Sequence, residues 1–231
     1  MDLLLIPGLW LDASSWDAVL PGLVSAGHRP HTVALPGLGV PAPESAGVTI
    51  TDWVAAVVAK LDEFAGPVVL VGHSGGGNVV WGAAEARPDK VARVIFVDSV
   101  PPPPGASIND FDVVDGVIPF PGWEFFDAEE VEDIPAEVKV REAARTLSVP
   151  ALVPSSPIEL SGTARHRVPV TVLSAGMDAT ELREALRNWG PFAAEAEAIV
   201  SLEVVKLGSG HWPQFSMPGR LAGLLAEAAG H

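Results

Sequence analysis

The sequence predicts an α/β protein built on an open, doubly wound and mostly parallel six-stranded sheet with helices on both faces. Six short apolar runs are typical of buried strands, and they fall at 3–6, 30–35, 67–71, 91–97, 168–174 and 202–207. Helical patterns separate most of these runs. Strands that are apolar on both faces and joined by helices indicate a parallel sheet that is covered on both sides.

The predicted helices are recognised by apolar residues at helical spacing. The clearest spans 51–64, where Trp53, Val57 and Leu61 fall on one face and Thr51 could cap the first turn. The same reasoning places helices at 15–26, 75–87, 135–147, 180–189 and 218–229.

One long stretch interrupts the alternation. About 70 residues, 99–167, separate the fourth strand from the fifth, and an insertion of this length is usually functional. We therefore expect a core formed by 1–98 and 168–231 with an inserted lid over the strand ends, although a plain surface excursion is the simpler alternative. Residues 107–142 contain eleven Asp or Glu residues and two basic residues, which gives a net charge of about −9. A solvated surface would explain this charge.

Composition excludes several classes of function. The formal charge is −15 and no basic stripe is visible, which argues against nucleic-acid binding. The absence of cysteine excludes disulfides and a thiol nucleophile. The start of the chain has no signal-peptide or membrane-span pattern, so a cytoplasmic protein is expected. The many Ala, Gly and Pro residues suggest a bacterial source. Scattered histidines and the lack of a phosphate loop predict no metal and no cofactor, and the oligomeric state is open.

The sequence Gly72-His73-Ser74-Gly75-Gly76 directly follows an apolar strand and precedes a helix. This is G-x-S-x-G in the context that places a serine hydroxyl at a sharp turn above a sheet. Glycines two residues before and after the serine avoid collisions with neighbouring backbone. The pattern predicts that Ser74 is a nucleophile.

A serine hydroxyl needs a base to remove its proton. Of the six histidines, His211 follows the last strand and so lies at the carboxyl end of the sheet, where catalytic groups gather. The other five are His28, His31, His73, His166 and His231, which fit structural or peripheral positions better. His211 is therefore the predicted base.

A carboxylate must orient that histidine, and two aspartates end strands. Asp178 follows the fifth strand through a short loop, and Asp98 follows the fourth strand directly. We expect Asp178 to serve as the acid, with Asp98 as the alternative that would otherwise brace nearby loops.

With these motifs the chain resembles the α/β-hydrolase superfamily, and within it the small serine esterase and hydroxynitrile-lyase-like branch. The resemblance lies in residues 3–10, the 72–76 turn, Gly176-Met177-Asp178 and Gly210-His211-Trp212-Pro213. It implies a Ser-His-Asp catalytic triad and an oxyanion hole formed by the backbone N–H groups of Leu9 and Gly75.

Two positions depart from what the resemblance leads one to expect. Pro7 stands where the superfamily usually has histidine. Gly8 and Trp212 stand where the lyases have threonine and lysine, which argues against cyanide chemistry.

Large aromatic residues near the predicted site favour an apolar substrate pocket, although each could simply pack the core. They are Trp10, Trp123, Phe125, Phe126 and Trp212. The expected function is hydrolysis of a small neutral carboxylic ester or lactone through an acyl-enzyme. The alternatives are a cofactor-independent lyase or cyclase, a perhydrolase on the same triad, or a non-catalytic small-molecule receptor.

Overall fold

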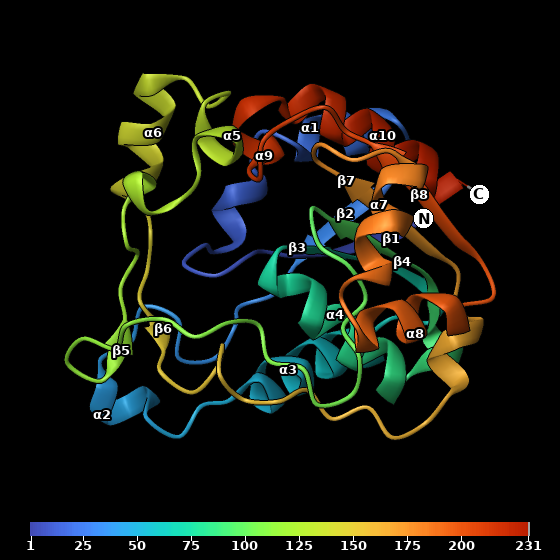
Figure 1. Ribbon diagram of the computed structural model, residues 1–231, viewed down its shortest axis with the longest axis horizontal. Helices are drawn as coiled ribbons and strands as arrows, with labels where there is room; N and C mark the ends of the chain where they lie inside the picture. The colour runs from blue at the N-terminus through green and yellow to red at the C-terminus, as the bar shows by residue number, and fades with distance from the viewer. Residues whose placement is uncertain (231) are drawn as a thin grey trace.

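The computed structural model describes residues 1–230, and His231 lies outside the described residues. Its main sheet has six strands, all of whose pairs are parallel, in the order β2-β1-β3-β4-β7-β8 (Figure 1). These strands are β1 (Asp2–Ile6), β2 (Arg29–Thr32), β3 (Val68–His73), β4 (Val91–Val97), β7 (Val170–Ser174) and β8 (Leu202–Lys206). The predicted fold class is confirmed.

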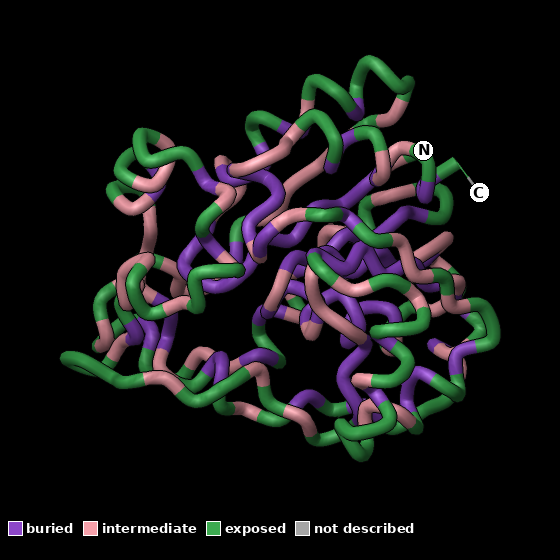
Figure 2. The backbone as a smooth tube through the Cα atoms, turned by 45° about the horizontal axis from the view of Figure 1, so that its top comes forward, coloured by how far each residue is buried: buried purple, intermediate pink, exposed green. Residues whose placement is uncertain are grey.

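Helices cover both faces of this sheet, and the two hydrophobic cores follow the alternation of side chains along each strand. Leu4, Ile6 and Leu70 face the core beneath α3 (Ile50–Asp62) and α4 (Gly75–Ala86). Leu3, Leu5 and Val69 face the core beneath α1 (Leu20–Ser25) and α10 (Pro218–Gly230), which pack against each other. The buried backbone gathers between these layers (Figure 2). Since neighbouring residues of a strand point to opposite faces, runs apolar at every position require both layers.

The helical predictions hold in outline and differ in detail. Residues 15–26 do not form one helix: a 3-10 turn, η1 (Ala13–Trp16), is followed by α1, which begins at Leu20 because Pro21 is tolerated only in a first turn. The sequence analysis did not include α8 (Pro191–Ala198), which packs against α7 (Ala179–Arg187). Short elements also escaped prediction: α2 (Ala42–Ser45), η2 (Pro88–Lys90) and α9 (Pro213–Ser216).

The segment between β4 and β7, here called the cap segment (residues 99–167), has little regular structure. Its elements are β5 (Val117–Ile118), η3 (Trp123–Phe125), α5 (Ala128–Val131), α6 (Ala136–Ala143), β6 (Val149–Pro150) and η4 (Ala164–Arg167). β5 and β6 form a small antiparallel pair. In Figure 1 most of the cap segment lies to one side of the sheet. Its function as a lid stays a prediction.

A buried ionic cluster joins the end of the cap segment to the core. Arg165, only 2% exposed, donates to both carboxylate oxygens of Glu195, at 2.8 and 2.9 Å, and to Glu85 at 3.1 Å. Trp81 Nε1 donates to the same Glu195 carboxylate at 2.8 Å. Burial raises the pKa of Glu195, but the hydrogen bonds from Arg165 and Trp81 outweigh it and leave that pKa below its ordinary value. The carboxylate is therefore held charged.

Two glycines in helices have opposite surroundings. A Cβ at Gly76 would lie 2.5 Å from the carbonyl oxygen of Pro7 and 2.7 Å from that of Ile6, and both atoms belong to backbone. At Gly223, in the exposed middle of α10, a Cβ would meet nothing within 4 Å. None of the helices within residues 1–230 is long and apolar enough to cross a membrane.

These surroundings predict opposite effects of the same substitution. Gly76→Ala should lower the free energy of unfolding by about 1–3 kcal/mol, because backbone must move to admit the methyl group. Gly223→Ala should raise it by about 0.5–1 kcal/mol, because alanine loses less backbone entropy in a helix. Urea unfolding of both variants and the wild type measures the two values. Equal effects would contradict the close backbone packing at Gly76.

Candidate active site

Ser74 occupies a strained turn between β3 and α4. Its backbone has φ 50° and ψ −125°, a region that non-glycine residues rarely adopt and that costs about 1–3 kcal/mol. A Cβ at Gly72 would lie 2.5 Å from the carbonyl oxygen of Gly76, so this position tolerates only glycine without a shift of backbone. The turn therefore has the geometry that the G-x-S-x-G pattern predicts.

His211 is hydrogen-bonded to Asp98. The distance from His211 Nδ1 to Asp98 Oδ2 is 2.6 Å, and Asp98 Oδ1 also accepts from the backbone N–H of Ala175 at 2.9 Å. Burial raises the pKa of Asp98, but the hydrogen bond and charge of His211 outweigh it, and the pKa lies below its ordinary value. An ionised Asp98 fixes the proton on Nδ1 and leaves Nε2 free to accept one.

The structure does not place Asp178 beside His211. Asp178 is the N-cap of α7, where its carboxylate accepts from the backbone N–H groups of Thr180 and Glu181 at 2.8 and 3.0 Å. The Glu181 side chain accepts in return from the N–H of Asp178. The expected acid is therefore corrected to Asp98, the alternative. The Asp-x-x-Glu pattern at 178–181 is a capping-box signal that could have revealed this in the sequence.

His73 is fully buried. It links the turn at residues 72–76, here called the nucleophile turn because Ser74 is the predicted nucleophile, to the loop at residues 208–213 that contains His211, here called the histidine loop. Its Nε2–H donates to the carbonyl oxygen of His211 at 2.8 Å, while Nδ1 accepts from Gln214 Nε2 at 3.3 Å. Burial is the main cause that lowers the pKa of His73 to about 3, so the ring is neutral at ordinary pH. This arrangement agrees with the structural role expected for His73, and it holds the backbone of His211 in place.

The two predicted oxyanion-hole residues are neighbours. A Cβ at Gly75 would lie 3.2 Å from Leu9 Cγ, and one at Gly8 would lie 3.2 Å from the Cβ of Ser74. Trp10, which follows, has φ 63°, and its carbonyl accepts from the N–H of Leu147 in the cap segment at 2.9 Å. The loop after β1 and the start of α4 thus meet beside Ser74, and the role of Leu9 and Gly75 stays a prediction.

Ser74 and His211 line the same cavity, which has a volume of about 320 Å³. Four of the five aromatic residues predicted for the pocket, Trp10, Phe125, Phe126 and Trp212, line it as well. The remaining lining residues are Leu9, Ile108, Asn109, Phe111, Asp127 and Glu130. Five of these residues, Ile108, Asn109, Phe111, Asp127 and Glu130, were not predicted as site residues, because only tertiary contacts bring parts of the cap segment to the site.

Trp123 does not line the cavity. Its ring packs edge-on against that of Trp212, with ring centres 5.3 Å apart, and its Nε1 donates to the carbonyl of Lys139 at 2.9 Å. Trp123 therefore supports the wall from behind.

The histidine loop is held by the cap segment. The N–H of His211 donates to the carbonyl oxygen of Glu130 at 2.8 Å, and the N–H of Gly210 donates to Asp133 Oδ2 at 2.8 Å. A Cβ at Gly210 would overlap the same Glu130 carbonyl. The cap segment thus contributes directly to the position of His211.

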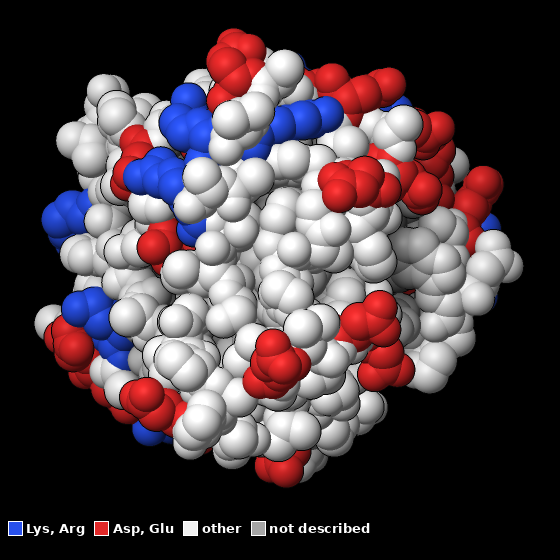
Figure 3. Space-filling model, turned by 90° about the vertical axis from the view of Figure 1, so that its left-hand side faces the viewer, with Lys and Arg blue, Asp and Glu red and all other residues white. Residues whose placement is uncertain are grey.

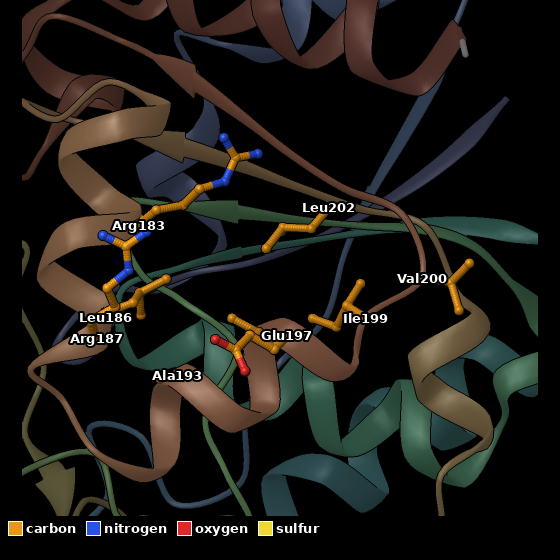
Figure 4. A pocket seen from close by; sticks show the side chains of 9 residues that line it. Arg183, Leu186, Arg187, Ala193, Glu197, Ile199, Val200 and Leu202 are labelled. Atoms are coloured by element: carbon orange, nitrogen blue, oxygen red, sulfur yellow. The ribbon is translucent and has the colours of Figure 1, made fainter.

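A second cavity of about 300 Å³ lies elsewhere, between α7, α8 and β8 (Figure 4). Arg183, Arg187 and Glu197 surround an apolar floor that includes Leu186 and Ile199. Neither serine nor histidine is among the residues that line it. Among residues 1–230 no group of three or more His, Cys, Asp or Glu side chains is arranged to hold a metal ion.

Comparison with known families agrees with this geometry. The profile described as the alpha/beta hydrolase family matches residues 3–224. The chain belongs to the alpha/beta hydrolase family. Curated relatives of this hydrolase include a pyrethroid hydrolase from Sphingobium wenxiniae, 27% identical over 99% of this chain and 87% of that protein.

Other curated relatives match a shorter region. Lipase LipV from Mycobacterium tuberculosis is 34% identical over 44% of this chain and 43% of the lipase. A pimeloyl-[acyl-carrier protein] methyl ester esterase from Aromatoleum aromaticum is 37% identical over 43% of this chain and 38% of the esterase. The matched regions therefore span less than half of these two relatives. Taken together, the relatives are hydrolases and esterases, and this chain is a hydrolase.

Solved structures show the same fold. An extracellular alpha/beta-hydrolase from a Paenibacillus species superposes with a TM-score of 0.78 at 20% identity, covering 99% of this chain and 98% of that one. A methylesterase from Arabidopsis superposes with a TM-score of 0.76 at 22% identity, covering 100% and 99%. At these identities the similarity concerns the fold alone.

Exchanging each aspartate for asparagine should separate the two candidate acids of this hydrolase. Asp98→Asn should lower kcat by about 10³–10⁴, because the neutral amide no longer fixes the tautomer or stabilises the imidazolium. Asp178→Asn should leave kcat within about twofold, because asparagine also caps helices well. Steady-state kinetics on an activated ester measures both. A large loss in Asp178→Asn with a small one in Asp98→Asn would reverse the assignment.

The buried, neutral His73 predicts how stability depends on pH. Its pKa is about 3 in the folded hydrolase and near 6.5 when unfolded, so below pH 6.5 the unfolded chain binds a proton that the folded chain does not. The contribution of His73 to the free energy of unfolding is therefore fully present above pH 6.5 and decreases as the pH falls toward 3. Urea unfolding between pH 7 and 4.5 should show a smaller decrease in His73→Gln, which cannot titrate. Identical slopes would contradict the buried neutral state.

Proposed function

We propose that the hydrolase cleaves small neutral carboxylic esters or lactones through an acyl-enzyme on Ser74, with His211 as base and Asp98 as the orienting acid. The observation that carries this proposal is the 2.6 Å hydrogen bond from His211 to Asp98, on a histidine that lines the same cavity as the serine of the strained turn. A partly buried carboxylate, an imidazole with a free Nε2 and a serine that lines the cavity are the parts that nucleophilic acyl transfer requires.

The proposed reaction uses these groups in two steps. Ser74 Oγ attacks the ester carbonyl while His211 Nε2 takes its proton, and the imidazolium then protonates the departing alkoxide. Water, deprotonated by His211, releases the acid and restores the serine. The N–H groups of Leu9 and Gly75 would stabilise the oxyanion, and the loss of one donor in comparable sites costs about 3 kcal/mol.

The walls of the cavity support an apolar substrate. Trp10, Phe111, Phe126 and Trp212 present aromatic surface beside the reacting groups. Lys and Arg are absent from the residues that line this cavity within the described part of the chain, so no side chain there would attract phosphate or carboxylate groups. The relatives named as pyrethroid hydrolase and pimeloyl-[acyl-carrier protein] methyl ester esterase support an ester as the substrate.

Labelling with a fluorophosphonate tests the proposal without knowledge of the substrate. Wild-type protein should gain the mass of one adduct, and Ser74→Ala and His211→Ala should gain none under the same conditions, because only an activated serine reacts. Intact-protein mass spectrometry measures the adduct, and circular dichroism confirms that each variant is folded. No adduct on folded wild type would refute an activated Ser74 and favour a binding protein.

A further inference from the structure

The charges around the cavity are of one sign. Asp127 and Glu130 line it, both from the cap segment, and they belong to the capping box at the start of α5. Glu130 Oε2 accepts from the N–H of Asp127 at 3.0 Å, which leaves each carboxylate with further lone pairs. A four-residue helix offsets little of their negative charge.

Three of the five basic residues of the cap segment are paired with carboxylates other than these two. Arg141 pairs with Glu142 at 2.6 Å, and Arg145 lies 3.7 Å from the same residue and 3.9 Å from Asp17. Arg165 is committed to the buried cluster with Glu195. The space-filling view also shows Lys and Arg concentrated toward one edge of its face, while acidic residues are spread more widely (Figure 3).

Aromatic rings stand beside the two carboxylates. Phe126 directly precedes Asp127, and its ring lies 5.4 Å from that of Trp212 and 6.1 Å from that of Trp10, measured between centres. Phe125 and Phe111 extend this set, 6.1 Å apart. The negative faces of such rings attract organic cations, and quaternary ammonium groups in particular are recognised by aromatic walls.

These two residues line the same cavity as Ser74 and His211. The carbonyl of Glu130 accepts from the N–H of His211, so one residue of α5 both supports the base and contributes a carboxylate to the cavity wall. A charged group of the substrate could therefore lie near Asp127 and Glu130 while its ester carbonyl lies at Ser74.

We propose that the cavity selects esters by charge, favouring substrates with an ammonium group over neutral ones and neutral over anionic ones, with Asp127 and Glu130 as the residues that determine this preference. This inference rests on the proposed ester hydrolysis and changes its preferred substrate from a neutral ester to one that carries an ammonium group. A cation gains from the carboxylates and the aromatic faces together, whereas an anion must approach two like charges and finds no partner.

Isosteric esters test the preference. Acetylcholine and 3,3-dimethylbutyl acetate have the same shape and differ in one charge, and 4-acetoxybutanoate supplies an anion. At low salt kcat/KM should be about tenfold higher for the cation than for its neutral isostere, the size expected from one cation–π contact and one exposed ion pair. It should be lowest for the anion, and the differences should shrink as salt screens the charges.

Conservative variants test whether Asp127 and Glu130 determine the charge preference. In the double variant Asp127→Asn, Glu130→Gln the ratio of the cationic to the neutral ester should fall to within about twofold, because asparagine and glutamine retain the capping box but not the charge. Glu129→Gln is the matched control: this exposed glutamate also lies on α5 but does not line the cavity, and the wild-type ratio should persist.

Two results would overturn the proposal. One is a wild-type ratio near or below one, and the other is a ratio that the double variant retains or that Glu129→Gln lowers equally. Calorimetric binding of acetylcholine and its isostere to Ser74→Ala gives the same comparison without turnover. If no ester were hydrolysed, the proposed function would fail, while the ratio of the two dissociation constants would still decide the charge preference.

Discussion

The site depends on the close packing of three stretches of backbone at the ends of β1 and β3. Because residue 76 is glycine, the first turn of α4 packs directly against the carbonyl oxygens of Ile6 and Pro7. Because residue 72 is glycine, the end of β3 packs directly against the carbonyl of Gly76 in the same turn. This packing holds Ser74 at positive φ, a conformation that costs about 1–3 kcal/mol and persists only where surrounding contacts impose it. It also sets Leu9 against Gly75, so the nucleophile turn and the predicted oxyanion donors form one packed unit.

Sequence reasoning recovers this part because its signals are local. Apolar runs locate the strands, and the spacing of glycines around Ser74 reports a backbone constraint that is present in the residues themselves. Neighbouring residues in the sequence do not decide whether Asp98 or Asp178 pairs with the histidine, because both aspartates follow strands that end at the same edge of the sheet. Asp98 has φ 45° and turns its carboxylate to Ala175 and His211, whereas the Asp178 carboxylate is used by its own helix. Pairing with a histidine 113 positions away requires the tertiary structure.

The cap segment was harder to predict for a related reason. Its regular elements are short, the longest being α6 with eight residues, and such elements take their conformation from tertiary contacts more than from propensity. The composition nevertheless predicted aromatic walls, and Trp10, Phe126 and Trp212 do meet there. What composition could not indicate is that α5 holds the histidine loop through the carbonyl of Glu130.

Both ends of the cap segment are fixed to the helix that starts at the nucleophile. At its beginning Ser99 lies against Gly77, in the first turn of α4, and at its end Arg165 is paired with Glu85 near the other end of α4. Removing one partner from such a buried ionic cluster typically costs about 3–5 kcal/mol, so the ends resist displacement. Any opening of the cavity must therefore arise in the middle of the segment. Because α5 lies there and the Glu130 carbonyl accepts from the N–H of His211, any such movement would also displace His211, the proposed base.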